Sequence, residues 1–352
     1  MAQTNVDITV KVAGKEISGD EVHDLVVEAD LDQPDMAAVV LSNKSTKWSE
    51  KVNLGDDVAI EGGFASNSSD AASIFKGEVT GLEPMYQTKG GLRVTIRALN
   101  ALHALSRGKK SVAYTKVTDK DIVDKICQLY SLSGEYGDAP PTVQYDHIYQ
   151  HNQTDLEFIR LRASRIGFEV FVVDKKLYFR KRNETDSGIT LEFGVSGKNI
   201  LEKFNPRLST ANQVSEVRVR AWDPDQKKEI IGTAKAQSSK LGDETGTKIA
   251  ENAKHSNILA IDVDVPVFSK EQADGIAKSV LQDRLMNFIT GDAQTKGNPN
   301  IKPGIVLTLK VGDKRFDGKY YVTAVRHRYV HEGPDHGFRT DFKFKRDASS
   351  SV

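Results

Sequence analysis

The segment TDLEFIRLRASRIGFEVFVVDKKLYFRK, residues 154–181, decides the fold of the middle of the chain. Thr154 and Glu157 have the spacing of an N-terminal capping box, and Gly167 stands where a left-handed residue ends a helix. Two β-rich runs follow Gly167 on either side of a polar turn at residues 174–176, which predicts a hairpin. Between cap and glycine, one helical face is apolar: Leu156, Ile159, Ala163 and Ile166.

A second helix is predicted upstream of this segment. Thr118 and Asp121 again have the spacing of a capping box, and apolar residues follow at helical spacing at Ile122, Ile126 and Leu129. Together with the helix and hairpin above, this pattern predicts an α+β insert domain over residues 107–189.

The chain before the insert has the pattern of short β-strands. Residues 6–12 alternate apolar and polar side chains with the period of two that a half-buried strand requires. Turn-forming residues separate further runs of the same type, and several short strands at such spacing indicate a barrel or a sandwich. We predict a first β-barrel domain over residues 1–106, with strands at 25–31, 36–41, 57–61, 74–82 and 92–99.

Strand character returns after the insert and predicts a second β-barrel domain over residues 190–352. Ser269 begins a capped, apolar-faced helix expected over residues 269–290. Residues 225–257 are poor in apolar side chains, which predicts a polar excursion or a loop ordered by a partner. The expected fold class is α+β, mostly β, and the strands of this part are 214–222, 261–265, 305–311, 320–330 and 338–344.

Composition excludes several classes of protein. The 352 residues include 49 Lys and Arg against 49 Asp and Glu, so the basic excess of a nucleic-acid-binding protein is absent. The single cysteine, Cys127, excludes an intramolecular disulfide and suits a reducing compartment. No apolar stretch approaches a membrane span, and residues 1–5 do not begin a signal peptide. We therefore expect cytoplasmic synthesis and assembly, without direct membrane insertion.

The neutral total hides two oppositely charged ends. Residues 1–84 carry 6 basic and 16 acidic residues, a net charge of −10, whereas residues 301–346 carry 11 and 5, a net charge of +6. Two interpretations stay open: these are solvated faces, as most charge runs are, or the acidic end of one copy faces the basic end of the next in a ring. The candidate assembly residues are Asp30, Asp32, Asp35, Lys314, Arg315, Arg326, Arg328 and Arg339.

No motif points to catalysis. Phosphate-binding glycine loops and the nucleophile elbow are absent, so we predict no catalytic or cofactor-binding residue. The pairs His147/His151 and His327/His331 have a spacing of four, but both lack the glutamate of the hydrolytic zinc motif. The second pair lies in a predicted strand, where residues four apart stand roughly 13 Å apart, too far for one metal ion, and no metal site is expected.

Two alternatives from other functional classes stay open. Acidic pairs, such as Asp262 and Asp264, would suit a glycan hydrolase that cleaves cell walls. The C-terminal aromatic residues would suit a carbohydrate-binding β-module, although aromatic side chains that alternate along strands belong more often to a core. These aromatic residues are Phe316, Tyr320, Tyr321, Tyr329 and Phe338.

Several segments resemble one family. Residues 197–206, 209–213 and 217–224 resemble the late control D family of phage tail hubs, which includes the hub half of VgrG proteins. The similarity extends over nearly the whole chain. Three shorter segments agree with the same family: 75–82, 151–159 and 316–322.

This resemblance implies a baseplate hub of a contractile injection system, such as a phage tail or a tailocin. Both barrels would resemble tail-tube subunits, and three copies would form a homotrimeric ring with pseudo-sixfold symmetry. The implied partners are the inner tube protein, other baseplate proteins and a spike, which we expect to be a separate polypeptide because no spike-like segment follows Arg346. The resemblance implies neither an enzyme nor a cofactor.

Overall fold

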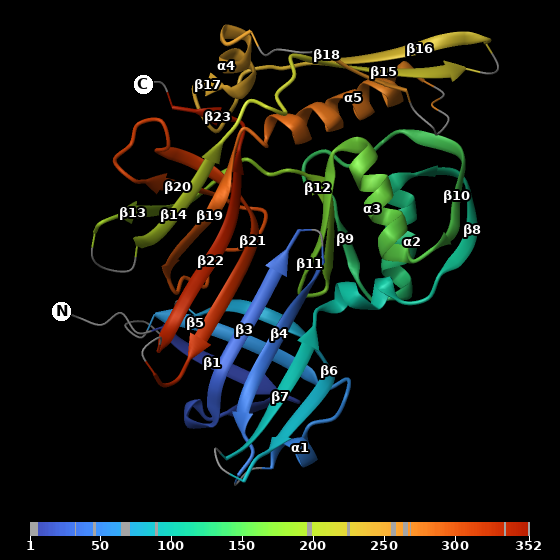
Figure 1. Cartoon of the computed structure of the whole chain (residues 1–352). Coiled ribbons are helices and arrows are strands. Elements are labelled where there is room, and N and C mark those ends of the chain that lie inside the picture. Colours follow the sequence, from blue (N-terminus) through green and yellow to red (C-terminus); the bar gives the residue numbers. More distant parts are fainter. Residues whose placement is uncertain are drawn as a thin grey trace.

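The computed structural model describes residues 6–31, 33–44, 47–64, 71–88, 91–195, 199–223, 226–254, 258–262, 267, 269–333 and 336–350. Thirteen of the described strands form one sheet, which combines strands from the N-terminal and the C-terminal parts of the chain. Figure 1 shows these two parts next to each other. The order of the sheet is β2-β1-β5-β6-β7-β4-β3-β21-β20-β13-β14-β19-β22, and β22 also pairs with β21. This last pairing closes a barrel of six strands.

The N-terminal half of the sheet curves around its own apolar core. Alternate side chains of its strands point inward, as the period of two requires, and Leu25, Val39, Ile60 and Ile96 are completely or almost completely buried there. The strands are β1 (Val6–Val12), β2 (Lys15–Ile17), β3 (Val22–Asp30), β4 (Gln33–Ser42), β5 (Asp57–Phe64), β6 (Ala72–Tyr86) and β7 (Leu92–Leu99), with the short helix α1 (Trp48–Lys51) after β4.

The insert has a separate core between two helices and two small sheets. Both predicted capping boxes are present, on Thr118 and Asp121 and on Thr154 and Glu157, and Gly167 is left-handed with a φ of 69°. Those local predictions are confirmed. The elements are β8 (Lys110–Thr118), α2 (Asp119–Leu129), β9 (Ser133–Glu135), β10 (Gln144–Gln153), α3 (Asp155–Ile166), β11 (Phe168–Val173) and β12 (Lys176–Lys181).

The closed barrel lies in the C-terminal part and has an aromatic core. Tyr320 and Phe344 lie edge to face with ring centroids 4.8 Å apart, and Phe204 stacks on Phe344 at 5.2 Å. The core interpretation of the C-terminal aromatic residues is thereby confirmed for Tyr320. The barrel strands are β13 (Asp186–Phe193), β14 (Ile200–Leu208), β19 (Ile289–Lys296), β20 (Val306–Lys310), β21 (Gly318–Val330) and β22 (Gly337–Arg346).

A small layer of three strands and one helix sits beside this barrel, at the top of Figure 1. It corrects two expectations. The polar stretch 225–257 is no mere excursion, because β16 pairs with β15 along eight residues and α4 follows. The helix expected over 269–290 ends at Leu285, since Ile289 already begins a barrel strand. Its elements are β15 (Glu216–Asp223), β16 (Lys228–Lys235), β18 (Ile258–Asp262) and α5 (Lys270–Leu285). The remaining elements are α4 (Gly246–Asn252) and a separate two-stranded sheet of β17 (Glu244–Thr245) and β23 (Ala348–Ser349).

Candidate functional site

The hairpin β11–β12 belongs to the insert and faces both the N-terminal sheet and the closed barrel. Its side chains alternate, so that Val170, Val172, Leu177 and Phe179 are buried in the core of the insert. The opposite face carries Glu169, Phe171, Tyr178 and Arg180, and these residues line two pockets against the N-terminal sheet and the closed barrel.

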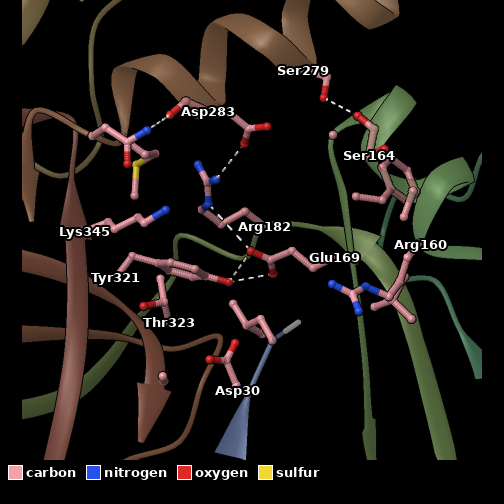
Figure 2. Close-up of a pocket in the computed structure, with 18 of the residues that line it drawn as sticks. Asp30, Arg160, Ser164, Glu169, Arg182, Ser279, Asp283, Tyr321, Thr323 and Lys345 are labelled. Atoms are coloured by element: carbon pink, nitrogen blue, oxygen red, sulfur yellow. Dashed lines mark hydrogen bonds and ion pairs between the residues drawn. The ribbon is translucent and has the colours of Figure 1, made fainter. Parts of the chain in front are cut away.

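The first pocket has a volume of about 660 Å³ and lies between the insert, α5 and the barrel strands β21 and β22 (Figure 2). Figure 2 shows Tyr321, Glu169 and Arg182 pointing toward one another across this space. The hydroxyl of Tyr321 donates a hydrogen bond to the Glu169 carboxylate, and it lies 2.6 Å from each carboxylate oxygen. The guanidinium of Arg182 lies over the Tyr321 ring, 5.3 Å from its centroid.

Ion pairs and one further hydrogen bond extend this network to α5. Arg182 lies 3.7 Å from Glu169 and 3.9 Å from Asp283 of α5. The hydroxyl of Ser279, also on α5, donates a hydrogen bond of 2.6 Å to the backbone carbonyl of Ser164 on α3. The contacts therefore tie the insert to both the barrel and the adjoining helix.

The charges in this network favour a stable connection between the insert and the barrel, which we call the clamp and which consists of Tyr321, Glu169 and Arg182. Burial and the neighbouring Glu169 carboxylate raise the pKa of Tyr321 well above its usual value, so its phenol stays protonated and remains a donor.

The predicted absence of a metal site concerns different residues. Within the part of the chain that the structure describes, no group of three or more His, Cys, Asp or Glu could hold a metal ion. His327, one of the spaced histidines, is buried and lies 3.0 Å from the Thr340 hydroxyl through its Nδ1 atom.

The predicted acidic residues lie at the end of β3 and the start of β4. Asp30 is half-buried and lines the first pocket. Burial raises the pKa of Asp35 to about 7, although hydrogen bonds from Asn100 and from the backbone of Asp30 oppose the shift. Asp32 lies outside the described residues.

The predicted basic residues form two groups. Arg326, Arg328 and Arg339 share the outer face of β21 and β22, where Arg328 and Arg339 are directly opposite each other across the strands. Arg326 lies 3.3 Å from Glu28 of β3, and Arg339 lies 3.9 Å from Glu202 of β14.

Lys314 and Arg315 are separate from these three residues. Both are exposed in the turn that precedes β21, at the opposite end of that strand. The structure thus brings three of the predicted basic residues together and leaves two apart.

The sequence does not predict that Glu169 and Arg182 contact Tyr321. Tyr321 is expected in the core, and it is indeed 1% exposed. Glu169 carries no signal, because a single charged residue in a hairpin is ordinary and its partner lies 152 positions away. Only the three-dimensional arrangement reveals the network.

Solved structures with the same fold are proteins of phage tails and of a secretion system. A 43 kDa tail protein of prophage MuSo2 from Shewanella oneidensis superposes with a TM-score of 0.70 at 13% identity, covering 97% of this chain and 98% of that chain. A tail protein from Neisseria meningitidis gives a TM-score of 0.69 at 14% identity, covering 97% of each chain.

A third structure comes from E. coli. It is a component of the type VI secretion system, described as structurally similar to the T4 tail proteins gp27 and gp5. Its TM-score is 0.60 at 13% identity, covering 95% of this chain and 76% of that chain. At these identities the likeness establishes the fold: a mostly β tail-protein fold with a closed barrel.

The sequence itself identifies the family. No curated protein matches the chain. Among the described residues, no helix is long and apolar enough to cross a membrane. The family model of the Alg8 N-terminal domain matches residues 2–331, which is nearly the whole chain, and the chain therefore belongs to the Alg8 N-terminal domain family.

Proposed function

We propose that this protein is a structural baseplate hub, which forms a homotrimeric ring between the hexameric inner tube and the trimeric spike of a contractile injection system. The observation that carries the proposal is the pairing of β3 with β21, from Asp24↔Val330 to Asp30↔Ala324. This pairing joins the N-terminal sheet and the closed barrel side by side in one continuous sheet. Three copies would then present six β-domains to the tube.

The fold of the neighbours supports this role. The prophage and Neisseria proteins are tail proteins, and the E. coli protein is likened to two phage tail proteins. We infer from these likenesses that the chain acts in a baseplate with an inner tube protein, a spike and other baseplate proteins. Its work would be geometric matching between assemblies, and not catalysis.

Charge provides the second line of support. Lys314 and Arg315 are exposed and have no ion pair among the described residues, so they are free to contact an acidic surface. The N-terminal part carries such an excess of acidic residues. Charges at the rim of an interface set the association rate and the register, and their effect weakens with salt.

The oligomeric state tests the proposal. Light scattering on the purified chain, alone and with its spike, should give three times the mass of one chain, and averaged particle images should show a ring with six similar lobes. A strict monomer under both conditions would contradict the hub. Release of sugars from purified cell walls would instead support a glycan hydrolase.

A charge-reversal variant tests the surface. Lys314→Glu with Arg315→Glu should weaken ring formation or docking to the tube and leave the melting temperature unchanged, since both side chains are exposed. The matched control is Lys227→Glu with Lys228→Glu, an exposed pair in the turn and start of β16. Equal loss of assembly in both variants would show that net charge matters and not this turn.

A further inference from the structure

A second, smaller pocket of about 230 Å³ lies farther along the hairpin β11–β12, toward its turn. Three separate parts of the chain build it: the N-terminal sheet, the insert, and the barrel segment Ile301–Ile305. Much of its wall is apolar, from Ile74 of β6, Phe171 of β11, and Pro303 and Ile305 of the barrel segment. The volume lies below the range of drug-sized sites, so only a small ligand fits.

Two cations line this pocket and have no ion pair with the described residues. Arg180 lies over the rings of Phe171 and Tyr178, 5.2 and 5.3 Å from their centroids, and its Nε atom is buried with no hydrogen-bond partner among the described residues. Lys302 is half-buried, and burial lowers its pKa, although the charge of Asp174 opposes this shift. In the described structure Lys302 forms neither an ion pair nor a hydrogen bond.

The two cations approach the same wall. The Nη2 atom of Arg180 lies 3.5 Å from the place that a Cβ on Gly304 would take, and Gly304 is two residues from Lys302. The neighbouring Lys76 differs, because its ammonium is neutralised by Asp174 at 2.9 Å. Positive charge that is half-buried and has no ion pair is costly, and an oxyanion would compensate it.

We propose that this pocket binds a small organic carboxylate, with its oxygens on Arg180 and Lys302 and its carbon chain against the apolar wall. The planar guanidinium of Arg180 suits a carboxylate, because it can donate two parallel hydrogen bonds. An inorganic anion would meet the same charges but would leave the apolar wall uncovered. The site does not depend on the oligomeric state proposed above.

The charged groups around the pocket make binding depend on pH. Asp35, whose pKa burial raises to about 7, lies in the wall together with Asp30, Lys76, Asp174 and the two cations. His327 also lines it, but burial lowers its pKa to about 4, so it stays neutral near pH 7. Deprotonation of Asp35 above its pKa adds a negative charge to the wall of the pocket and should weaken the binding of an anion.

Titration calorimetry with sodium butyrate on the full chain tests the site. We expect one site per chain, with tighter binding at pH 6 than at pH 8 and weaker binding of inorganic phosphate. Arg180→Gln and Lys302→Gln should each lower the affinity about tenfold or more, since each removes one charged contact. Asp35→Asn should bind equally at both pH values.

The matched control is Lys176→Gln, on the same strand as Arg180 but exposed and outside the pocket, which should bind as the unchanged chain does. If Arg180→Gln fails to fold, as circular dichroism would reveal, Lys302→Gln carries the test, because Lys302 belongs to the barrel segment and not to the hairpin. Absence of butyrate binding, equal binding of phosphate, or an equal loss in Lys176→Gln would each overturn the proposal.

Discussion

The hydroxyl of Tyr321 lies 2.6 Å from both carboxylate oxygens of Glu169, and this contact joins the closed barrel to the insert across 152 positions of sequence. Both groups are largely buried: Tyr321 is 1% exposed and the Glu169 side chain 14%. A hydrogen bond to a buried carboxylate contributes more than an ordinary one, since the charge would otherwise lose its solvation. The contact therefore fixes the orientation of the insert.

Tyr321→Phe should lower the free energy of unfolding by about 1–3 kcal/mol, because it removes this hydrogen bond and leaves the carboxylate with Arg182. Amide hydrogen exchange should also accelerate in β11. Urea unfolding and exchange mass spectrometry measure the two effects. Tyr178→Phe is the control on the hairpin itself, because the Tyr178 hydroxyl forms no hydrogen bond with the described residues. An equal loss in both variants would argue against the clamp.

Arg162→Ala should destabilise the insert strongly. The guanidinium of Arg162 donates two hydrogen bonds, of 2.6 and 3.2 Å, to the carboxylate of Asp119, and their side chains are 6% and 1% exposed. Removal of one member of a buried pair leaves the other charge uncompensated, at a cost of about 3–5 kcal/mol. Chemical denaturation measures this cost.

The exposed pair Arg97 and Glu83 is the control for that experiment, since it has the same two-point geometry, with Nε and one Nη of Arg97 on the two carboxylate oxygens. Solvent screens this pair, so Arg97→Ala should cost no more than about 1 kcal/mol. Similar losses for Arg162→Ala and Arg97→Ala would contradict the role of burial.

Two glycines in the layer beside the barrel should respond to alanine with opposite signs. Gly275 lies within α5, and nothing lies within 4 Å of the place that a Cβ would take there, so Gly275→Ala should stabilise by up to about 1 kcal/mol. A Cβ on Gly232 of β16 would clash with the backbone of Ala273, so Gly232→Ala should separate the strand from the helix and destabilise. Thermal unfolding of both variants decides, and a loss in Gly275→Ala would refute this account.

Local signals make the helices and hairpins predictable. The capping boxes at Thr118 and Thr154 and the glycine at 167 act through neighbouring backbone groups, so their spacing in the sequence is their spacing in space. The stretch 225–257 escapes prediction because β16 buries one face only, on α5, with Ile230 as its buried large apolar side chain. A strand of this kind has almost no hydrophobic pattern.

Contacts between residues far apart in the sequence cannot be predicted from it for a different reason. The alternation in β3 and in β21 predicts two strands but says nothing about which edges pair, and residues such as Val27 and His327 meet across some 300 positions. The charged assembly residues have the same limit. Their types predict a surface, whereas the grouping of Arg326 with Glu28 depends on that pairing.

Asp35→Asn should change the pH dependence of stability. The pKa of Asp35 rises from 3.8 to about 7 in the folded chain, chiefly through burial. Between these values the folded state holds a proton that the unfolded state has released, so the free energy of unfolding falls as the pH rises through this window. Asparagine has no proton to lose, and the variant should therefore gain stability relative to the unchanged chain at pH 8 compared with pH 5.

Urea unfolding of both chains at the two pH values measures this gain. Asp20→Asn is the control, because Asp20 is exposed in the turn before β3 and should give the same difference from the unchanged chain at both pH values. If Asp35→Asn gave a pH-independent difference as well, the buried carboxyl would not be the source of the effect, and the pH arm of the butyrate experiment would lose its basis. A gain confined to high pH would instead tie proton release by Asp35 to both the stability of the fold and the charge of the small pocket.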